Sequence, residues 1–144
     1  MQLYHDGVVA ETRHSTGESD NLLNDVLDFM VKSYGLRFED TMIRKKSYSS
    51  EIILSSDIAL DSISPKFAKF FDLLQNFVPD VPDFRTCGIH FASEADSSQS
   101  GSIFRLERQV KQPFSSNRYY SQAPVRTEVH IVLVEALEEI LESR

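Results

Sequence analysis

Two stretches of strand-forming residues joined by a polar segment constrain the fold of this chain more than any other feature. Residues 84–92 carry aromatic and β-branched side chains, and residues 103–109 alternate apolar with polar side chains. The connecting residues 93–102 are rich in serine and contain no large apolar side chain. A strand, a solvated connection and a second strand form a β-hairpin pattern. We therefore expect these two strands to pair at the centre of a sheet.

Three segments show the apolar periodicity of amphipathic helices, and we expect helices over residues 19–34, 64–78 and 127–141. Gly35 follows the first segment, where glycine is a favoured C-terminal stop. The second segment opens with Ser64 and Pro65, a favourable N-cap and first helical residue. Its phenylalanines recur at helical spacing, so we expect this aromatic stripe to lie in the core.

The remaining segments complete the expected fold. Asp6-Gly7 predicts a tight hairpin turn near the N-terminus, and residues 36–43 and 48–55 have the composition of strands. Residues 110–124 contain Pro113 and Pro124 and predict an irregular loop. The order of elements predicts a single α+β domain over residues 1–144, with a mostly antiparallel sheet and about three helices packed on it.

The net negative charge of the chain limits the classes of partner that we expect it to bind. Fifteen Lys and Arg against 22 Asp and Glu give a net charge of −7, so we expect neither a nucleic-acid nor a membrane partner. We expect no signal peptide, because residues 1–6 lack a basic start followed by an apolar run. We expect no membrane span, because the longest apolar run covers only residues 131–134. A single cysteine, Cys87, excludes an internal disulfide and favours a reducing compartment. The composition therefore predicts a soluble, cytoplasmic protein.

The sequence lacks the motifs that identify common enzymes. All five glycines are isolated, so the sequence contains no glycine-rich phosphate-binding loop. The four histidines fall in four different expected elements, and we expect neither a metal nor a cofactor. Cys87 and His90 would point to opposite faces of one strand, which separates the thiol from that imidazole. We expect Cys87 to be a buried structural cysteine.

The predicted loop supplies the candidate partner-binding residues, which are Phe114, Arg118, Tyr119 and Tyr120. Tyrosine and arginine dominate binding hot spots. We therefore favour a non-enzymatic protein-binding module, of the inhibitor, immunity-protein or assembly-subunit type. It would act through this aromatic and arginine loop and an acidic surface, with a protein partner and a homo-oligomer as a further option. The alternative is that these aromatic side chains hold the loop against the sheet.

A second set of polar residues supports a different function. Arg105 and Glu107 share one face of their strand, and Arg85 and His90 lie on the strand expected to pair with it. Such a group can bind a carboxylate or position a general base. The alternative function is therefore a small enzyme or small-molecule binder on the central sheet, unless these residues form an ordinary cross-strand salt bridge.

Overall fold

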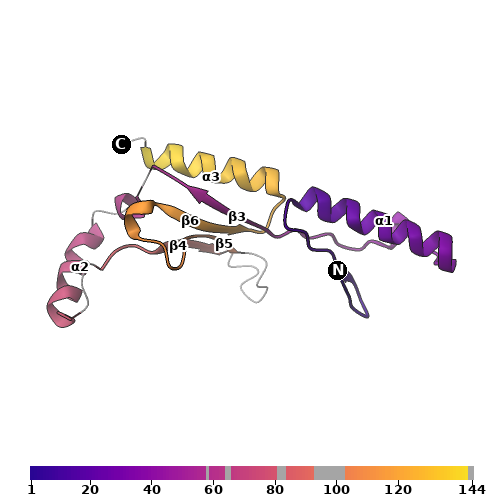
Figure 1. Cartoon of the computed structure of the whole chain (residues 1–144), viewed down its shortest axis with the longest axis horizontal. Coiled ribbons are helices and arrows are strands. Elements are labelled where there is room, and N and C mark those ends of the chain that lie inside the picture. The colour runs from indigo at the N-terminus through magenta and orange to yellow at the C-terminus, as the bar shows by residue number, and fades with distance from the viewer. Residues whose placement is uncertain (58, 64–65, 81–83, 93–102, 143–144) are drawn as a thin grey trace.

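A computed structural model describes residues 1–57, 59–63, 66–80, 84–92 and 103–142 (Figure 1). The described residues form the helices α1 (Thr16–Tyr34), α2 (Lys66–Phe77) and α3 (Thr127–Glu142). A four-stranded sheet contains β3 (Ser50–Ser55), β4 (Gly88–Ala92), β5 (Ile103–Arg108) and β6 (Arg118–Ala123). A separate ribbon pairs β1 (Gln2–Leu3) with β2 (Val8–Val9). The α+β class and the antiparallel sheet are as the sequence predicts.

The strand order of the larger sheet is β3-β6-β5-β4, and every pairing in it is antiparallel. The predicted pairing of β4 with β5 is confirmed, with Phe91 opposite Phe104. However, β4 is an edge strand, and the position between β3 and β5 belongs to β6. The prediction of an irregular loop over residues 110–124 is therefore wrong for Arg118–Ala123. Small Ser121 and Ala123 face the core there, so the strand lacks the bulky alternation that marks a buried face.

Local capping explains where α1 begins and ends. The Ser15 side chain accepts a hydrogen bond from the Glu18 backbone N–H, so the helix begins earlier than its apolar pattern predicts. Gly35 ends it in the left-handed region, at a φ of 66°, as predicted. The strand predicted over residues 36–43 is absent from the described structure, which has a 3-10 turn at Asp40–Met42 instead. The predicted cap of α2 at residues 64–65, and the connection 93–102, lie outside the described residues.

The core lies between one face of the sheet and α3. Its centre is formed by Leu60, Leu106 and Tyr119, with Leu54, Phe104 and Leu137 among the side chains packed around them. Alternation along β5 and β6 sends Leu106, Tyr119 and Ser121 toward α3. The opposite face, which carries Arg105, Glu107 and Tyr120, is called the open sheet face below.

His130 ties α3 to this core through a buried imidazole. The Ser121 hydroxyl donates its hydrogen to the Arg105 carbonyl at 2.9 Å, so it must accept from His130 Nε2–H at 2.8 Å. His130 Nδ1 is then the acceptor for the Ser50 hydroxyl, also at 2.8 Å. In a neutral ring this arrangement fixes one tautomer, and burial, which lowers the pKa of His130, favours that neutral form.

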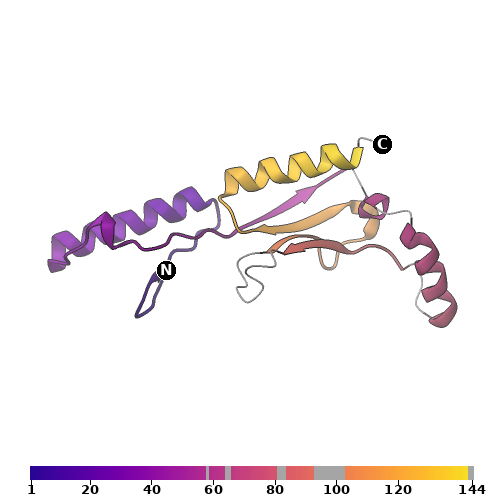
Figure 2. The same ribbon diagram turned by 180° about the vertical axis from the view of Figure 1, so that it is seen from behind.

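The other two helices project from the sheet instead of covering it. Figures 1 and 2 show α1 extending beyond the end where α3 begins, and α2 extending beyond the opposite end. The expectation that the aromatic stripe of α2 lies in the core is wrong, because Phe70 is 54% exposed and Phe77 is 84% exposed. Amphipathic periodicity identifies an apolar helix face, but it does not specify what covers that face.

Replacing Leu106 with alanine should destabilise the protein by about 2–5 kcal/mol, because the substitution leaves a cavity in the core. The control Val132→Ala removes methyl groups from a side chain of α3 that is 61% exposed, and should cost about 0.5 kcal/mol or less. Urea denaturation measures both changes. Equal losses of stability would contradict this placement of the core.

The lowered pKa of His130 predicts a specific pH dependence of stability. The unfolded chain takes up a proton near pH 6.5, whereas the folded chain resists protonation until a lower pH. The stability from neutral His130 is therefore present above pH 6.5 and lost as the pH falls below it. Urea melts between pH 7.5 and 5 should show a smaller slope for His130→Gln than for the wild type. The control His5→Gln, at an exposed position, should keep the wild-type slope.

Candidate functional site

The structure separates the four predicted partner-binding residues. Tyr119 is 1% exposed and belongs to the core, where its hydroxyl accepts a hydrogen bond from the Leu60 N–H at 3.3 Å. Arg118 is exposed at the start of β6. Tyr120 lies half-buried on the open sheet face and accepts a hydrogen bond from Arg105 Nη2 at 3.4 Å. These residues therefore do not form one continuous surface patch.

The fourth residue, Phe114, packs against arginine side chains in a turn, η4 (Phe114–Ser116). The Arg108 guanidinium lies 4.4 Å from its ring centroid, and Arg85 lies 5.9 Å away. Arg108 also donates to the Phe114 carbonyl at 2.8 Å and the Thr86 carbonyl at 3.2 Å. Its Nη2 pairs with Asp61 at 3.3 Å. This geometry fits the alternative in which the aromatic side chain holds the loop against the sheet.

Arg108 and Asp61 were not among the residues predicted from the sequence, yet they connect three distant segments. Asp61 Oδ1 accepts from the Thr86 N–H at 3.0 Å, while its Oδ2 pairs with Arg108. The arginine at the end of β5 gives no sequence signal of this role, because its partners are far apart in the chain. Charge-assisted hydrogen bonds of this kind are among the stronger ones.

Three of the four residues of the predicted polar site share the open sheet face. His90 Nε2 lies 2.7 Å from Glu107 Oε1, across the β4–β5 pair. Arg105 lies beside them and its guanidinium is 5.1 Å from the Tyr120 ring centroid. The hydrogen bond with Tyr120 raises the pKa of Arg105, which is charged at any physiological pH. Arg85 does not join them, because it lies near Asp61 and Phe114.

This polar group can bind a small carboxylate, but it has few features of a catalytic site. Arg105 Nε is buried and has no hydrogen-bond partner among the described residues, so a ligand that reached it would satisfy an unpaired donor. The His90 side chain is 56% exposed and the Glu107 side chain is 36% exposed, so their contact resembles a surface ion pair. Cys87 is exposed, so the expectation of a buried cysteine is wrong.

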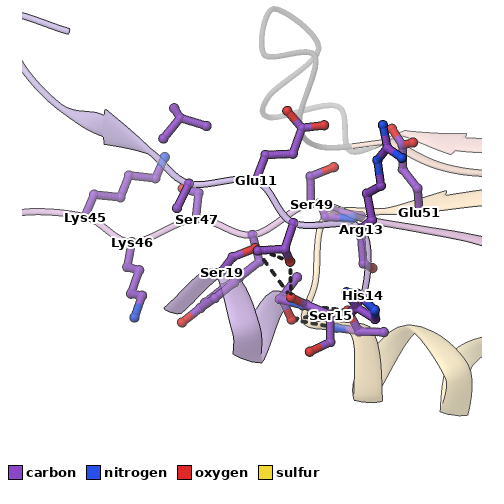
Figure 3. Close-up of a pocket in the computed structure, with 18 residues that line it drawn as sticks. Glu11, Arg13, His14, Ser15, Ser19, Lys45, Lys46, Ser47, Ser49 and Glu51 are labelled. Carbon is purple, nitrogen blue, oxygen red and sulfur yellow. Dashed lines mark hydrogen bonds between the residues drawn. The ribbon is translucent and has the colours of Figure 1, made fainter. Parts of the chain in front are cut away.

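A groove of about 1010 Å³ lies between residues 9–16, residues 45–51 and the first residues of α1 and α3 (Figure 3). Its lining carries Glu11 and Glu51 as well as Arg13 and Lys45, so neither sign of charge dominates. Lys46 also lines the groove, but it pairs with Asp20 at 2.8 Å, so its charge is already offset. The groove therefore has no charge preference that would specify a ligand class.

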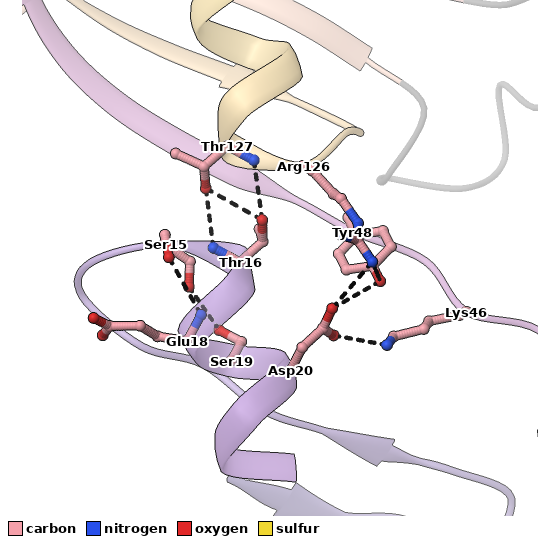
Figure 4. A network of polar contacts seen from close by, with 9 residues as sticks. All are labelled: Ser15, Thr16, Glu18, Ser19, Asp20, Lys46, Tyr48, Arg126 and Thr127. Carbon is pink, nitrogen blue, oxygen red and sulfur yellow. Dashed lines mark hydrogen bonds and ion pairs between the residues drawn. The ribbon is translucent and has the colours of Figure 1, made fainter. Parts of the chain in front are cut away.

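The start of α1 meets the start of α3 in a polar junction (Figure 4). The Thr16 N–H donates to Thr127 Oγ1 at 3.0 Å, and the Thr127 N–H donates to Thr16 Oγ1 at 3.0 Å. Each threonine thus satisfies a backbone donor at the N-terminus of the other helix. This exchange fixes the first turn of α1 next to α3.

Asp20 supplies the charged part of the same junction. It pairs with Lys46 at 2.8 Å and Arg126 at 3.2 Å, and it accepts from the Tyr48 hydroxyl at 3.0 Å. The Lys46 hydrogen bond is the largest of the effects that lower the pKa of Asp20.

Beyond this junction, α1 exposes large apolar side chains along most of its length, namely Leu22, Phe29, Met30, Val31 and Tyr34. The Phe29 and Tyr34 rings meet edge to face at 5.9 Å. Glu18, Asp25 and Asp28 lie on the same helix. The helix therefore combines an exposed apolar surface with acidic side chains.

Comparisons with known proteins found no match: no family model, no curated protein and no solved structure is similar to this chain. Across the described ranges, no group of three or more His, Cys, Asp or Glu side chains is arranged to hold a metal ion. Within the same ranges, no helix is long and apolar enough to cross a membrane.

Replacing Asp20 with asparagine should loosen α1 at its junction with α3. The change removes the charge that pairs with Lys46 and Arg126, and should lower the free energy of opening the first turns of α1 by about 1–2 kcal/mol. Amide hydrogen exchange measures that opening. The control Asp25→Asn makes the same change at an exposed position of the same helix and should leave exchange nearly unchanged. Equal effects of the two variants would contradict the role of the junction.

Proposed function

We propose that this protein is a non-enzymatic module that binds another protein, and that the binding surface is the exposed apolar face of α1 with its acidic flank. The observation that carries the proposal is the exposure of Phe29 and Tyr34, whose rings touch at the C-terminal end of this helix. Met30 is exposed between them in the sequence, and Leu22 lies two turns before Phe29 on the same side. A surface helix normally turns its apolar side to its own core, and contiguous exposed apolar surface marks interaction sites.

The apolar surface of α1 has the shape of a helix-binding ridge. Leu22 and Phe29 are two helical turns apart, so they lie along one side of the helix, and Phe29 is 56% exposed. Tyr34, the last residue of the helix, adds to this surface through the contact of its ring with that of Phe29. A partner that lays an apolar helix face on this side of α1 would bury these rings.

The charges on α1 favour a basic partner. The helix contains four acids and one lysine, which gives it a net charge of −3 within a chain of net charge −7. Asp20 is already neutralised in the junction, and Asp28 lies 3.6 Å from Lys32. Glu18 lies 3.2 Å from His14 Nδ1. Asp25 is therefore the acid that remains to attract lysine or arginine beside the apolar surface, which increases association rate and specificity. The partner segment is therefore amphipathic and basic.

A small-molecule site on the open sheet face is the second candidate function. The buried Arg105 Nε, which has no hydrogen-bond partner among the described residues, favours it. A short carboxylate such as acetate would then bind the wild type and lose affinity in Arg105→Met. Calorimetric titration measures this binding. If the wild type binds no carboxylate, this candidate function is ruled out.

The protein-binding proposal is tested with a fluorescently labelled synthetic helical peptide that presents leucines on one side and lysines on the other. Fluorescence anisotropy should show binding to the wild type, with affinity that falls as salt rises. Phe29→Asp should weaken binding by about 30-fold or more, the loss typical of a hot-spot residue. Asp25→Asn should reduce the salt dependence.

The matched control is Phe70→Asp on α2, because its phenylalanine is exposed to nearly the same extent, 54% against 56% for Phe29. This variant should bind the peptide within threefold of the wild type. A peptide with glutamates in place of the lysines should not bind. Failure of the wild type to bind the lysine peptide, or an equal loss in both variants, would overturn the proposal.

A further inference from the structure

We infer that two copies of this chain associate through the apolar face of α2. This inference goes beyond the proposed function, because it concerns a different helix at the opposite end of the sheet (Figures 1 and 2). The molecule that we propose to cover that face is a second copy of the same chain.

The apolar side of α2 is exposed over most of its described length. Its exposed members are Phe67, Phe70, Leu73 and Phe77, followed by Val78 just beyond the helix. Phe71 and Leu74 are half-buried on the same helix. Leaving so many large apolar side chains in water opposes the hydrophobic effect. A stable state of the protein should therefore cover this face.

The total surface of the chain supports a subunit interface. A compact monomer of 16.4 kDa exposes roughly 7,500 Å², whereas this chain exposes 11206 Å². The difference is about 3,700 Å². An obligate dimer interface removes about 1,000–2,500 Å² from each chain. The excess is thus large enough for such an interface and for a further partner on α1.

Charge selects α2 as the surface on which two copies meet. Two chains that each carry a net charge of −7 repel one another, so they should approach where the local charge is least negative. The sequence of α2 has two lysines and one aspartate, a net charge of +1, whereas α3 has five glutamates and no lysine or arginine. With α1 at −3, α2 has the most favourable charge for self-association among the three described helices.

The face of α2 is also suited to pair with itself. In a two-fold symmetric dimer the same patch is used on both chains, so each α2 must be both ligand and receptor. A broad stripe of phenylalanine and leucine meets this requirement, because ridges of one helix can pack between those of its symmetry mate. Paired aromatic side chains add contacts beyond simple area burial.

The test measures the solution mass of the full chain by light scattering coupled to size-exclusion chromatography. The wild type should have twice the chain mass of 16.4 kDa. Phe70→Asp should reduce the mass to that of one chain, because two carboxylates would be forced into an apolar contact. Circular dichroism of Phe70→Asp should match the wild type, since Phe70 makes no part of the core.

The matched control is Phe29→Asp, which places the same charge at an equally exposed phenylalanine on α1 and should leave the mass at two chains. A wild type with the mass of one chain at every concentration tested would overturn the inference. So would a Phe70→Asp variant that remains two chains, or a Phe29→Asp variant that dissociates. Peptide binding to α1 is measured separately, so failure of one proposal does not imply failure of the other.

Discussion

Among the described elements, α3 is the helix that covers a face of the sheet, and the hydrogen bonds of His130 hold it there. One buried imidazole receives a hydrogen bond from Ser50 of β3 and donates one to Ser121 of β6, and thereby fixes α3 across both strands. The apolar core beside it is small, with Leu60, Leu106 and Tyr119 at its centre. Because a buried polar group is costly unless it is satisfied, any shift of α3 that breaks either bond is disfavoured. The remainder of the structure is attached to this unit.

The two other helices are attached to the ends of that unit by polar contacts, and their apolar faces remain free for other molecules. The Thr16–Thr127 exchange and the Asp20 cluster hold α1, while Arg108 and Asp61 fasten the segments that lead into and out of α2. These polar contacts orient α1 and α2 without burying much of their apolar surface. This division explains how a folded chain can present two separate apolar helix faces, one acidic and one slightly basic.

Local patterns predict the elements of this protein better than they predict its packing. Helical periodicity, Gly35 and the Asp6-Gly7 turn identify α1, α2, α3 and the small ribbon, because each signal depends on neighbouring residues. The strand β6 is not predicted from the sequence, because its core-facing residues include the small Ser121 and Ala123. Tyr119 is of a residue type common in binding hot spots, but it is buried. The phenylalanine-rich stripe of α2 resembles a core segment, but it is exposed. Periodicity does not distinguish a face buried within the chain from one available to a partner.

The head-to-head junction of α1 and α3 has a thermodynamic consequence. Its contacts are hydrogen bonds and ion pairs, so separating the two helices would hydrate mostly polar groups. Exposure of polar surface lowers the heat capacity, whereas exposure of apolar surface raises it. Detachment of α1 should therefore carry a small heat-capacity change, unlike the opening of the core around Leu106. The orientation of α1 would then respond more to ionic strength than to temperature.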